Sequence, residues 1–215
     1  MKIFFNKNKL IKDIKNEKKL GFVPTMGAIH KGHLSLIKNS QRKCQKTLVS
    51  IFVNKPQFNK KNDFQKYPRT IQRDILLLKK NKVNYLFIPS MKQMYPNGVN
   101  RNIKIIPFAK KLCGRSRPNH FESIADVIDR FIKIVKPKKI FFGEKDMQQL
   151  KIIESFVKYK YPEIKVVGCK TIREKNGVAL SSRNSLLSSV EMIKASNTYK
   201  FIDTLLKNEK KYEAL

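Results

Sequence analysis

Residues 21–34 read Gly-Phe-Val-Pro-Thr-Met-Gly-Ala-Ile-His-Lys-Gly-His-Leu, and this stretch decides the fold. A short apolar run ends at Thr25, a glycine-bearing turn follows, and apolar residues recur at helical spacing from Leu34 onward. The pattern predicts a strand, a turn and a helix, with His30 and His33 at the helix N-terminus. Free N–H groups and the helix dipole favour phosphate binding there, at the carboxyl end of a strand. Taken alone, His-x-Gly-His is a short pattern that two surface histidines near a turn would explain equally well.

The same alternation of short apolar runs and longer amphipathic segments continues along the chain. It predicts βαβ units around a parallel sheet and therefore an α/β fold. The expected strands cover residues 21–25, 47–53, 84–88, 139–142 and 164–168. The expected helices cover residues 34–44, 70–81, 124–135 and 147–159. Ser188 and Glu191 form a capping box that opens a further helix running toward Lys207.

The formal net charge of +31 over 215 residues points, by itself, to nucleic acid or an anionic membrane surface. The lysines, however, are scattered through every segment rather than gathered on one face, so compositional drift explains the charge. The N-terminus lacks the continuous apolar region of a secretory signal, and no run reaches the roughly 18 apolar residues of a membrane helix. We therefore expect a cytoplasmic protein, and keep a basic nucleic-acid-binding protein on the same scaffold as an alternative.

Two polar clusters follow later expected strands. Asn54 and Gln57 come after the second strand, where carboxamides can hold a hydroxy acid through paired donors and acceptors. The same side chains could instead satisfy the backbone of a turn. Lys145 lies where the fourth strand passes into a helix, and a cation at a helix N-terminus opposes the dipole unless an anion binds there. Its neighbour Asp146 could simply cap that helix.

Two loops complete the set of candidate sites. In residues 181–183, two serine hydroxyls and a guanidinium could clamp a triphosphate by charge-assisted hydrogen bonds, although a polar loop before a helix is the plain alternative. Residues 113–121 form a basic loop that could also face phosphate. The three histidines of the chain, His30, His33 and His120, all fall inside these clusters.

Five motifs occur in order and at matching spacing from about residue 21 to residue 184. They are PTMGAIHKGHLSLI, VSIFVNKPQF with YPRT, CGRSRPNHF, IFFGEKDMQQL, and VVGCKTIRE followed by ALSSRN. Together they resemble the successive motifs of pantothenate synthetases, the pantoate–β-alanine ligases. The resemblance implies a Rossmann-like parallel sheet of the HxGH nucleotidyltransferase type.

The resemblance also implies the chemistry. The pantoate carboxylate would attack the α-phosphorus of ATP to give a pantoyl adenylate and pyrophosphate, and the β-alanine amine would then displace AMP. Mg²⁺ would accompany the triphosphate, with protein ligands that the motifs do not assign. The expected partners are these small molecules and a second copy in a homodimer, without a membrane or a specific nucleic acid. The alternatives are another adenylyltransferase of the superfamily and a weakly active or inactive remnant.

Matching the motifs residue by residue gives the implied site. His33 would be the proton-donating catalytic histidine, His30 its phosphate-binding partner, and Lys145 a third catalytic residue. Asn54, Gln57 and Gln149 would hold pantoate. The ATP site would consist of Met26, Gly27, Ala28, Ile29, His30, Lys31, Gly32, His33, Gly143, Glu144, Lys145, Asp146, Ile172, Leu180, Ser181, Ser182 and Arg183.

The resemblance further implies a division of the chain. Residues 1–183 would be the Rossmann-like catalytic domain that binds ATP and pantoate, and residues 184–215 the start of a truncated C-terminal lid domain. Without a complete lid, water would reach the acyl adenylate, so we expect adenylation to survive with reduced efficiency. Asn119 stands where the family usually has glycine, and asparagine tolerates the left-handed backbone better than most residues.

Overall fold

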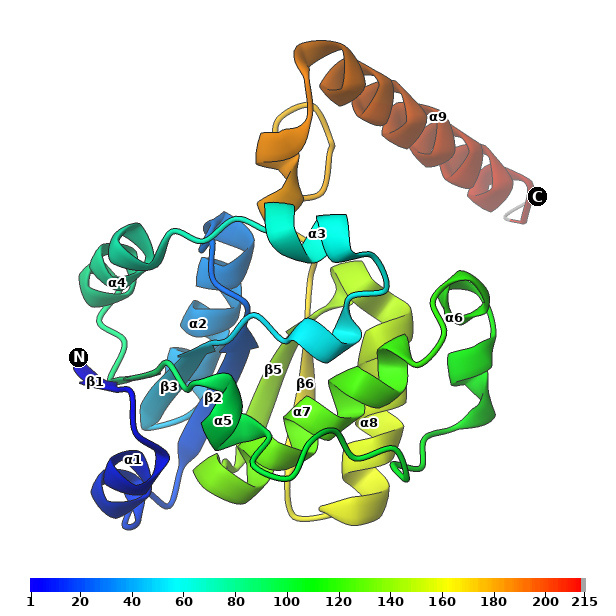
Figure 1. The fold of residues 1–215 in the computed structure, drawn as a ribbon. Coiled ribbons are helices and arrows are strands. Elements are labelled where there is room, and N and C mark those ends of the chain that lie inside the picture. Colours follow the sequence, from blue (N-terminus) through cyan, green and yellow to red (C-terminus); the bar gives the residue numbers. More distant parts are fainter. Residues whose placement is uncertain (214–215) are drawn as a thin grey trace.

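A six-stranded sheet forms the centre of the chain, and its paired strands all run parallel (Figure 1). The computed structural model describes residues 1–213, with side chains as far as residue 208. The strands are β1 (Lys2–Phe4), β2 (Leu20–Thr25), β3 (Lys46–Ile51), β4 (Tyr85–Phe87), β5 (Lys139–Gly143) and β6 (Lys165–Cys169). Their order is β1-β4-β3-β2-β5-β6. The chain moves outward from β2 to β4 on one side and from β5 to β6 on the other, which places a topological switch point between β2 and β5.

Helices cover both faces of the sheet, because successive strand residues point to opposite sides. The long helices are α1 (Lys7–Ile14), α2 (Lys31–Lys43), α4 (Ile71–Lys80), α7 (His120–Val135), α8 (Met147–Lys160) and α9 (Ser189–Glu213). Short helical turns in the loops are α3 (Lys61–Lys66), α5 (Met91–Met94), α6 (Cys113–Ser116), η1 (Lys55–Gln57), η2 (Pro107–Lys110), η3 (Glu144–Asp146) and η4 (Ser182–Leu186).

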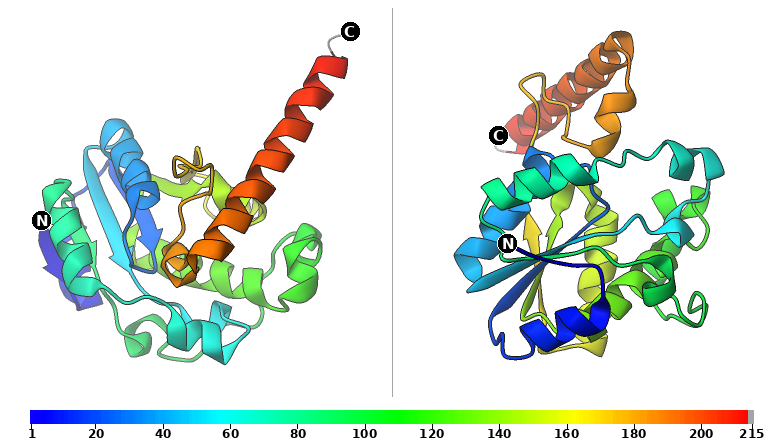
Figure 2. Two further views of the ribbon diagram at one scale, coloured as in Figure 1. Left: turned by 90° about the horizontal axis from the view of Figure 1, so that it is seen from above. Right: turned by 60° about the vertical axis from the view of Figure 1, so that its left-hand side comes forward.

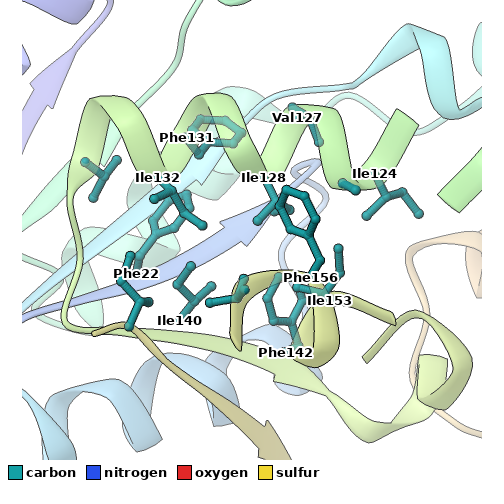
Figure 3. Close-up of a cluster of buried hydrophobic side chains, with 14 of the residues drawn as sticks. Phe22, Ile124, Val127, Ile128, Phe131, Ile132, Ile140, Phe142, Ile153 and Phe156 are labelled. Atoms are coloured by element: carbon teal, nitrogen blue, oxygen red, sulfur yellow. The ribbon is translucent and has the colours of Figure 1, made fainter. Parts of the chain in front are cut away.

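Two hydrophobic cores result from this layering. Phe22 and Phe142 point to one face, where α1, α7 and α8 pack. Figure 3 shows this core, with Phe131 of α7 close to the strands; its ring centre lies 5.2 Å from that of Phe22. Val23 and Phe141 point to the other face, where α2 and α4 pack. The expected α/β fold with a parallel sheet is confirmed.

Each expected strand is present within two residues of its predicted ends, and the expected helices also form. The helix predicted from residue 124 begins four residues earlier, at His120. No pattern predicted β1 or α1. β1 has only three residues, and α1 is a short helix interrupted by lysines that begins after Asn6, whose side chain accepts two backbone N–H groups.

The last helix, α9, begins at the predicted capping box. The Glu191 N–H donates to Ser188 Oγ at 3.3 Å, and Ser188 N–H donates to Glu191 Oε2 at 2.8 Å. Ser196 Oγ donates to the Asn176 carbonyl at 2.7 Å and ties the first part of α9 to the preceding loop. Figure 2 shows the rest of α9 projecting away from the sheet. Within residues 1–213, none of the helices has the length and apolar character needed to cross a bilayer.

The pairing of β2 explains where the sheet opens. Its ladder with β3 runs the full length of both strands, whereas its ladder with β5 covers only Gly21 and Phe22. Pro24 has no N–H with which to extend a ladder. β2 and β5 therefore separate toward their carboxyl ends, and the separation leaves room for a cleft at the switch point.

Gly21 lets α2 pack closely on β2. A methyl group at this position would collide with Ser40 Oγ and lie 3.0 Å from Cys44 Sγ. We expect Gly21→Ala to lower the free energy of unfolding by about 1–3 kcal/mol through overpacking, measured by urea denaturation. Adding Ser40→Ala should recover part of this loss, since it removes the closest atom. If the double variant instead loses the sum of the free energies lost in Gly21→Ala and Ser40→Ala, the added methyl group does not collide with Ser40.

Candidate active site

A cavity of about 230 Å³ lies at the carboxyl ends of β2, β5 and β6, at the switch point. Met26, His33, Gln57, Lys145 and Arg183 all line it, although they come from segments far apart in the sequence. Apolar side chains of α7 complete one wall; they are Ile124, Val127, Ile128 and Phe131. The fold therefore brings four of the five predicted clusters to one cavity.

His30 and His33 cap the N-terminus of α2. The Nδ1 atom of His30 accepts the N–H of Gly32 at 3.1 Å, and the Nδ1 atom of His33 accepts the N–H of His30 at 3.4 Å. The two ring centres lie 4.1 Å apart. Because each Nδ1 accepts a hydrogen bond, each neutral imidazole carries its proton on Nε2. The capping bonds thus leave each histidine with a ring N–H that faces no acceptor among the residues described, and both side chains line the cavity.

Burial and nearby positive charge keep the two histidines neutral. Burial lowers the pKa of His33 to about 3, and His30 and Lys145 contribute to the same shift. The pKa of His30 is lowered first by burial and then by Lys145. An anion in the cavity would oppose these shifts, because negative charge stabilises an imidazolium. At neutral pH the pair consists of uncharged hydrogen-bond donors that can gain a proton as negative charge arrives.

A buried carboxylate holds the loop between β2 and α2. Asp74, in the first turn of α4, is 1% exposed and accepts the N–H groups of Ala28 at 2.9 Å and Ile29 at 2.8 Å. Thr70 Oγ1 donates to the same carboxylate at 3.0 Å. Gly27 and Ala28 have φ angles of +83° and +49°, and alanine adopts the left-handed region only where its surroundings enforce it. Asp74 supplies that enforcement.

Lys145 lines the cavity from the turn between β5 and α8. Its Nζ atom lies 2.9 Å from Asp146 Oδ1, in an ion pair whose side chains are 37% and 57% exposed. Asp146 precedes the first residue of α8 but makes no capping hydrogen bond, so helix capping does not explain it. An exposed ion pair contributes little free energy, so a phosphate can replace the carboxylate as the partner of Lys145.

Asn54 and Gln57 lie together where the chain leaves β3. Asn54 Nδ2 donates to Gln57 Oε1 at 3.1 Å, and the Asn54 side chain does not cap the turn that follows it. Gln149, in the first turn of α8, lines the same cavity. These three carboxamides therefore offer neutral donors and acceptors beside the histidine pair.

Arg183 reaches the cavity from the loop after β6 and is held by α3. Its Nε and Nη2 atoms donate to the two carboxylate oxygens of Asp63 at 3.0 and 2.9 Å, and its guanidinium lies 5.2 Å from the centre of the Tyr67 ring. The hydrogen bonds to Asp63 raise the pKa of Arg183. Ser182 Oγ donates to the Ala28 carbonyl at 3.3 Å and joins this loop to the one after β2.

The basic loop at residues 113–121 borders the site, but its arginines do not line the cavity. His120 is 5% exposed, and its Nδ1 atom lies 2.7 Å from the Gln57 carbonyl oxygen. A carbonyl only accepts, so this nitrogen carries the proton. Asn119 has a φ angle of +59°, which confirms the left-handed backbone anticipated at this position. The loop acts here by supporting the backbone of Gln57.

Comparison with known proteins agrees with this geometry. Residues 3–215 match the family model described as pantoate-beta-alanine ligase. The chain belongs to the pantoate-beta-alanine ligase family. A pantothenate synthetase from Sulfurihydrogenibium sp. (strain YO3AOP1) is 47% identical over 186 residues, which cover 86% of this chain and 66% of that protein. One from Pseudothermotoga lettingae is 44% identical over 183 residues, which cover 85% and 65%.

The fold is also that of solved members of the family. The crystal structure of pantothenate synthetase from Thermus thermophilus has a TM-score of 0.86 and 37% identity, and the match covers 93% of this chain and 72% of that one. The pantoate-beta-alanine ligase of Francisella tularensis, crystallised with β-γ ATP and β-alanine, has a TM-score of 0.86 and 40% identity over 93% and 78%. This chain spans about two thirds of the length of the curated relatives named above.

Most residues that the family motifs single out line the cavity. These are Met26, His30, Gly32, His33, Asn54, Gln57, Gly143, Lys145, Asp146, Gln149, Ile172, Leu180, Ser181, Ser182 and Arg183. The residues that do not line it are Gly27, Ala28, Ile29, Lys31 and Glu144. Ile29 is buried in the core, and the backbone of Ala28 and Ile29 is bound to Asp74. Lys31 is exposed to solvent.

Sequence reasoning missed the residues that do not line the cavity but bind the loops that form it. Asp74 and Asp63 are acidic residues in or near a first helical turn, and such residues are ordinary there. Their roles come from contacts with loops 46 and 120 residues away in the chain. Lys170 and Thr171 also line the cavity; they lie within the motif VVGCKTIRE, but no role was predicted for them.

The lowered pKa values of His33 and His120 predict how stability depends on pH. The pKa of folded His33 is about 3 and that of folded His120 about 4, both lowered mainly by burial, against 6.5 in the unfolded chain. Unfolding therefore takes up protons below pH 6.5, and stability falls as the pH drops from 6.5 toward these values. Between pH 6.5 and 5 we expect a loss on the order of 1–2 kcal/mol per histidine, measured by urea denaturation.

Replacing the two side chains provides the control for this pH dependence. In the double variant His33→Gln, His120→Gln the slope of stability against pH in this window should flatten. If the slope is unchanged, other groups cause it and the histidines are not buried as neutral bases.

Asp74 predicts a separate, local effect. Asp74→Asn replaces one acceptor oxygen with an amino group facing a backbone N–H, so we expect a loss of about 2–3 kcal/mol and faster hydrogen exchange at Ala28 and Ile29. Asp13→Asn, which affects an exposed ion pair with Lys2, should change stability by less than about 1 kcal/mol. Equal losses of stability in Asp74→Asn and Asp13→Asn would show that the Asp74 carboxylate does not hold the loop after β2.

Proposed function

We propose that this chain carries the machinery for ATP-dependent activation of pantoate and its condensation with β-alanine to pantothenate. The observation that carries the proposal is the pair of capped, neutral histidines that share one switch-point cavity with three carboxamides. The histidine side of this cavity suits phosphate and the carboxamide side suits a hydroxy acid. The Francisella tularensis relative, crystallised with β-γ ATP and β-alanine, supports the same substrates here.

The phosphate side would contain His30, His33 and Lys145. A pantoate carboxylate oxygen attacks the α-phosphorus and forms the new P–O bond, while the bond from that phosphorus to the bridging oxygen of pyrophosphate breaks. Negative charge grows on the departing pyrophosphate, where Nε2–H donors and the Lys145 ammonium stabilise it. This growing charge would raise the low pKa of His33 and favour its proposed role as proton donor.

The acid side would contain Asn54, Gln57 and Gln149. Neutral amides can bind a carboxylate and hydroxyls without a full positive charge that would weaken the nucleophile. Pantoate also carries two methyl groups, and the apolar wall from α7 gives them a surface to pack on. The amine of β-alanine would then attack the acyl carbon and release AMP.

The nucleotide would extend toward the loop after β6. Ile172 and Leu180 line this part of the cavity and suit the adenine, and Ser181, Ser182 and Arg183 suit the phosphates. Arg183 would have to exchange Asp63 for a phosphate in order to contact the nucleotide. The remaining members of the proposed ATP-binding set are Met26, Gly27, Ala28, Ile29, Lys31, Gly32, Gly143, Glu144 and Asp146.

Mg²⁺ would reach the site with the nucleotide. Within residues 1–208, no group of three or more His, Cys, Asp or Glu side chains could hold a metal ion. The residues described therefore form no protein cage for the ion that ordinarily accompanies ATP, and Mg²⁺ would be bound chiefly by phosphate and water.

We extend the proposal to the organisation of the chain. Residues 1–183 would form the ATP- and pantoate-binding unit, and residues 184–215, of which 214–215 lie outside the described part, would begin the second unit that closes over the cleft. Large apolar side chains exposed along α9, such as Val190, Ile193 and Phe201, support a covering role for that segment. The homodimer and cytoplasmic location expected from the sequence belong to the same proposal.

The decisive assay is pantoate-dependent exchange of labelled pyrophosphate into ATP. We expect exchange by the unmodified chain and a loss of about 10²–10³-fold in His33→Ala, because a donor to the developing charge is removed. Lys38→Ala, a substitution elsewhere on the same helix, should exchange like the unmodified chain.

The outcomes of this assay separate the alternatives. Absence of exchange together with tight binding of an oligonucleotide would sink the ligase proposal in favour of a basic nucleic-acid-binding protein. Exchange without pantothenate would support the adenylation half alone.

A further inference from the structure

A buried phenol lies behind the carboxamides of the site. Tyr95 follows α5 and is 9% exposed, and its hydroxyl donates to Asn54 Oδ1 at 2.6 Å. Asn54 is itself 1% exposed. A polar group at this depth must be hydrogen-bonded, so the Asn54 oxygen depends on Tyr95 for its partner.

The orientation of the Asn54 amide is fixed on its other side as well. Its Nδ2 atom donates to the Ser123 carbonyl at 3.3 Å and to Gln57 Oε1 at 3.1 Å. A carbonyl can only accept, so the amide nitrogen must face Ser123. The three bonds use both amide hydrogens of Asn54 and the hydroxyl of Tyr95, and a flipped amide would place oxygen against oxygen.

The consequence reaches the cavity through Gln57. Its Oε1 atom accepts from Asn54, while its Nε2 atom has no hydrogen-bond partner among the side chains described. Gln57 thus presents amide donors, not its carbonyl, to whatever binds in the cavity. Two N–H donors suit the oxygens of a carboxylate or hydroxyl, whereas a carbonyl would repel a carboxylate.

We propose that Tyr95 is a positioning residue for the hydroxy acid, acting through Asn54 to hold the Gln57 amide with its donors toward the substrate. This inference rests on the proposed function for the identity of the acid, but the orientation of the two amides can be tested without it.

Tyr95 is held rigidly enough to do this. The guanidinium of Arg130 lies 4.3 Å from the centre of its ring. Arg130 also donates to the Met94 carbonyl at 2.6 Å and the Gly98 carbonyl at 2.9 Å, on either side of Tyr95, and pairs with Asp126 at 2.8 Å. The turn that carries the phenol is thereby clamped to α7, the helix that also supplies the Ser123 carbonyl.

The test is Tyr95→Phe, which removes one hydroxyl and keeps the ring. We expect the KM for pantoate to rise about tenfold, with the KM for ATP changed less than about twofold, because the Gln57 amide is then free to turn its carbonyl toward the acid. Tyr161→Phe is the matched control: its hydroxyl donates to Asp129 at 2.7 Å, away from the cavity. It should leave both KM values unchanged. Equal rises for pantoate and ATP in Tyr95→Phe, or no rise, would overturn the inference.

A second readout does not depend on activity. In ¹⁵N-labelled protein, the Asn54 side-chain NH₂ signals should be slow to exchange with solvent, and Tyr95→Phe should speed this exchange about tenfold while Tyr161→Phe does not. If the Asn54 hydrogens exchange with solvent at the same rate in Tyr95→Phe, Tyr95 does not hold the Asn54 amide and the inference fails. This outcome can be read even if the unmodified chain does not catalyse pyrophosphate exchange. If Tyr95→Phe does speed the exchange of the Asn54 hydrogens but the unmodified chain shows no catalysis, the result counts against the proposed function alone.

Discussion

The incomplete pairing of β2 with β5 is the constraint on which the rest of the structure depends. β2 pairs with β3 along its whole length, but its ladder with β5 stops after Phe22, two residues before Pro24. In a parallel sheet every carboxyl end lies at one edge, so the separation of two central strands opens that edge at the point where strand order reverses. The histidine, carboxamide, lysine and arginine clusters each follow a strand that ends there, and they meet for this reason.

The side chains of His30 and His33 serve the helix and the cavity at once, through different ring nitrogens. Each Nδ1 accepts a backbone N–H at the start of α2, and neither Nε2–H has a partner within the described part of the chain. Helix capping and anion binding both use the unpaired backbone N–H groups at a helix N-terminus, so a capping side chain ordinarily competes with an anion for them. Here the imidazole Nδ1 atoms accept the backbone N–H groups, and the Nε2–H groups replace them as donors to an anion. A substitution at His33 therefore acts on the helix and on the cavity together, and activity must be interpreted with stability measured alongside.

Much of this was predictable from the sequence, and the part that was not has a common cause. Strands, helices and the histidine-bearing turn follow from periodicity and local signals, which depend on neighbours within a few residues. Asp74, Tyr95 and Asp63 carry no such signal. Asp74 resembles any acidic residue in a first helical turn, and Tyr95 resembles a core aromatic residue. Their roles depend on partners 46, 41 and 120 residues away, which only the folded chain brings into contact.

Asp74 fixes the loop after β2, and this determines whether the conformational entropy of the loop is lost on folding or on binding. Gly27 and Ala28 hold left-handed backbone angles, and hydrogen bonds made within the protein fix the N–H groups of residues 27–29. Ordering a residue costs about 1–2 kcal/mol, and a loop that orders only around its substrate subtracts that amount from affinity. In this chain the cost falls on folding, so a nucleotide would meet a loop already in place. The affinity would then be lowered chiefly by the exchange of Asp63 for a phosphate that we propose for Arg183.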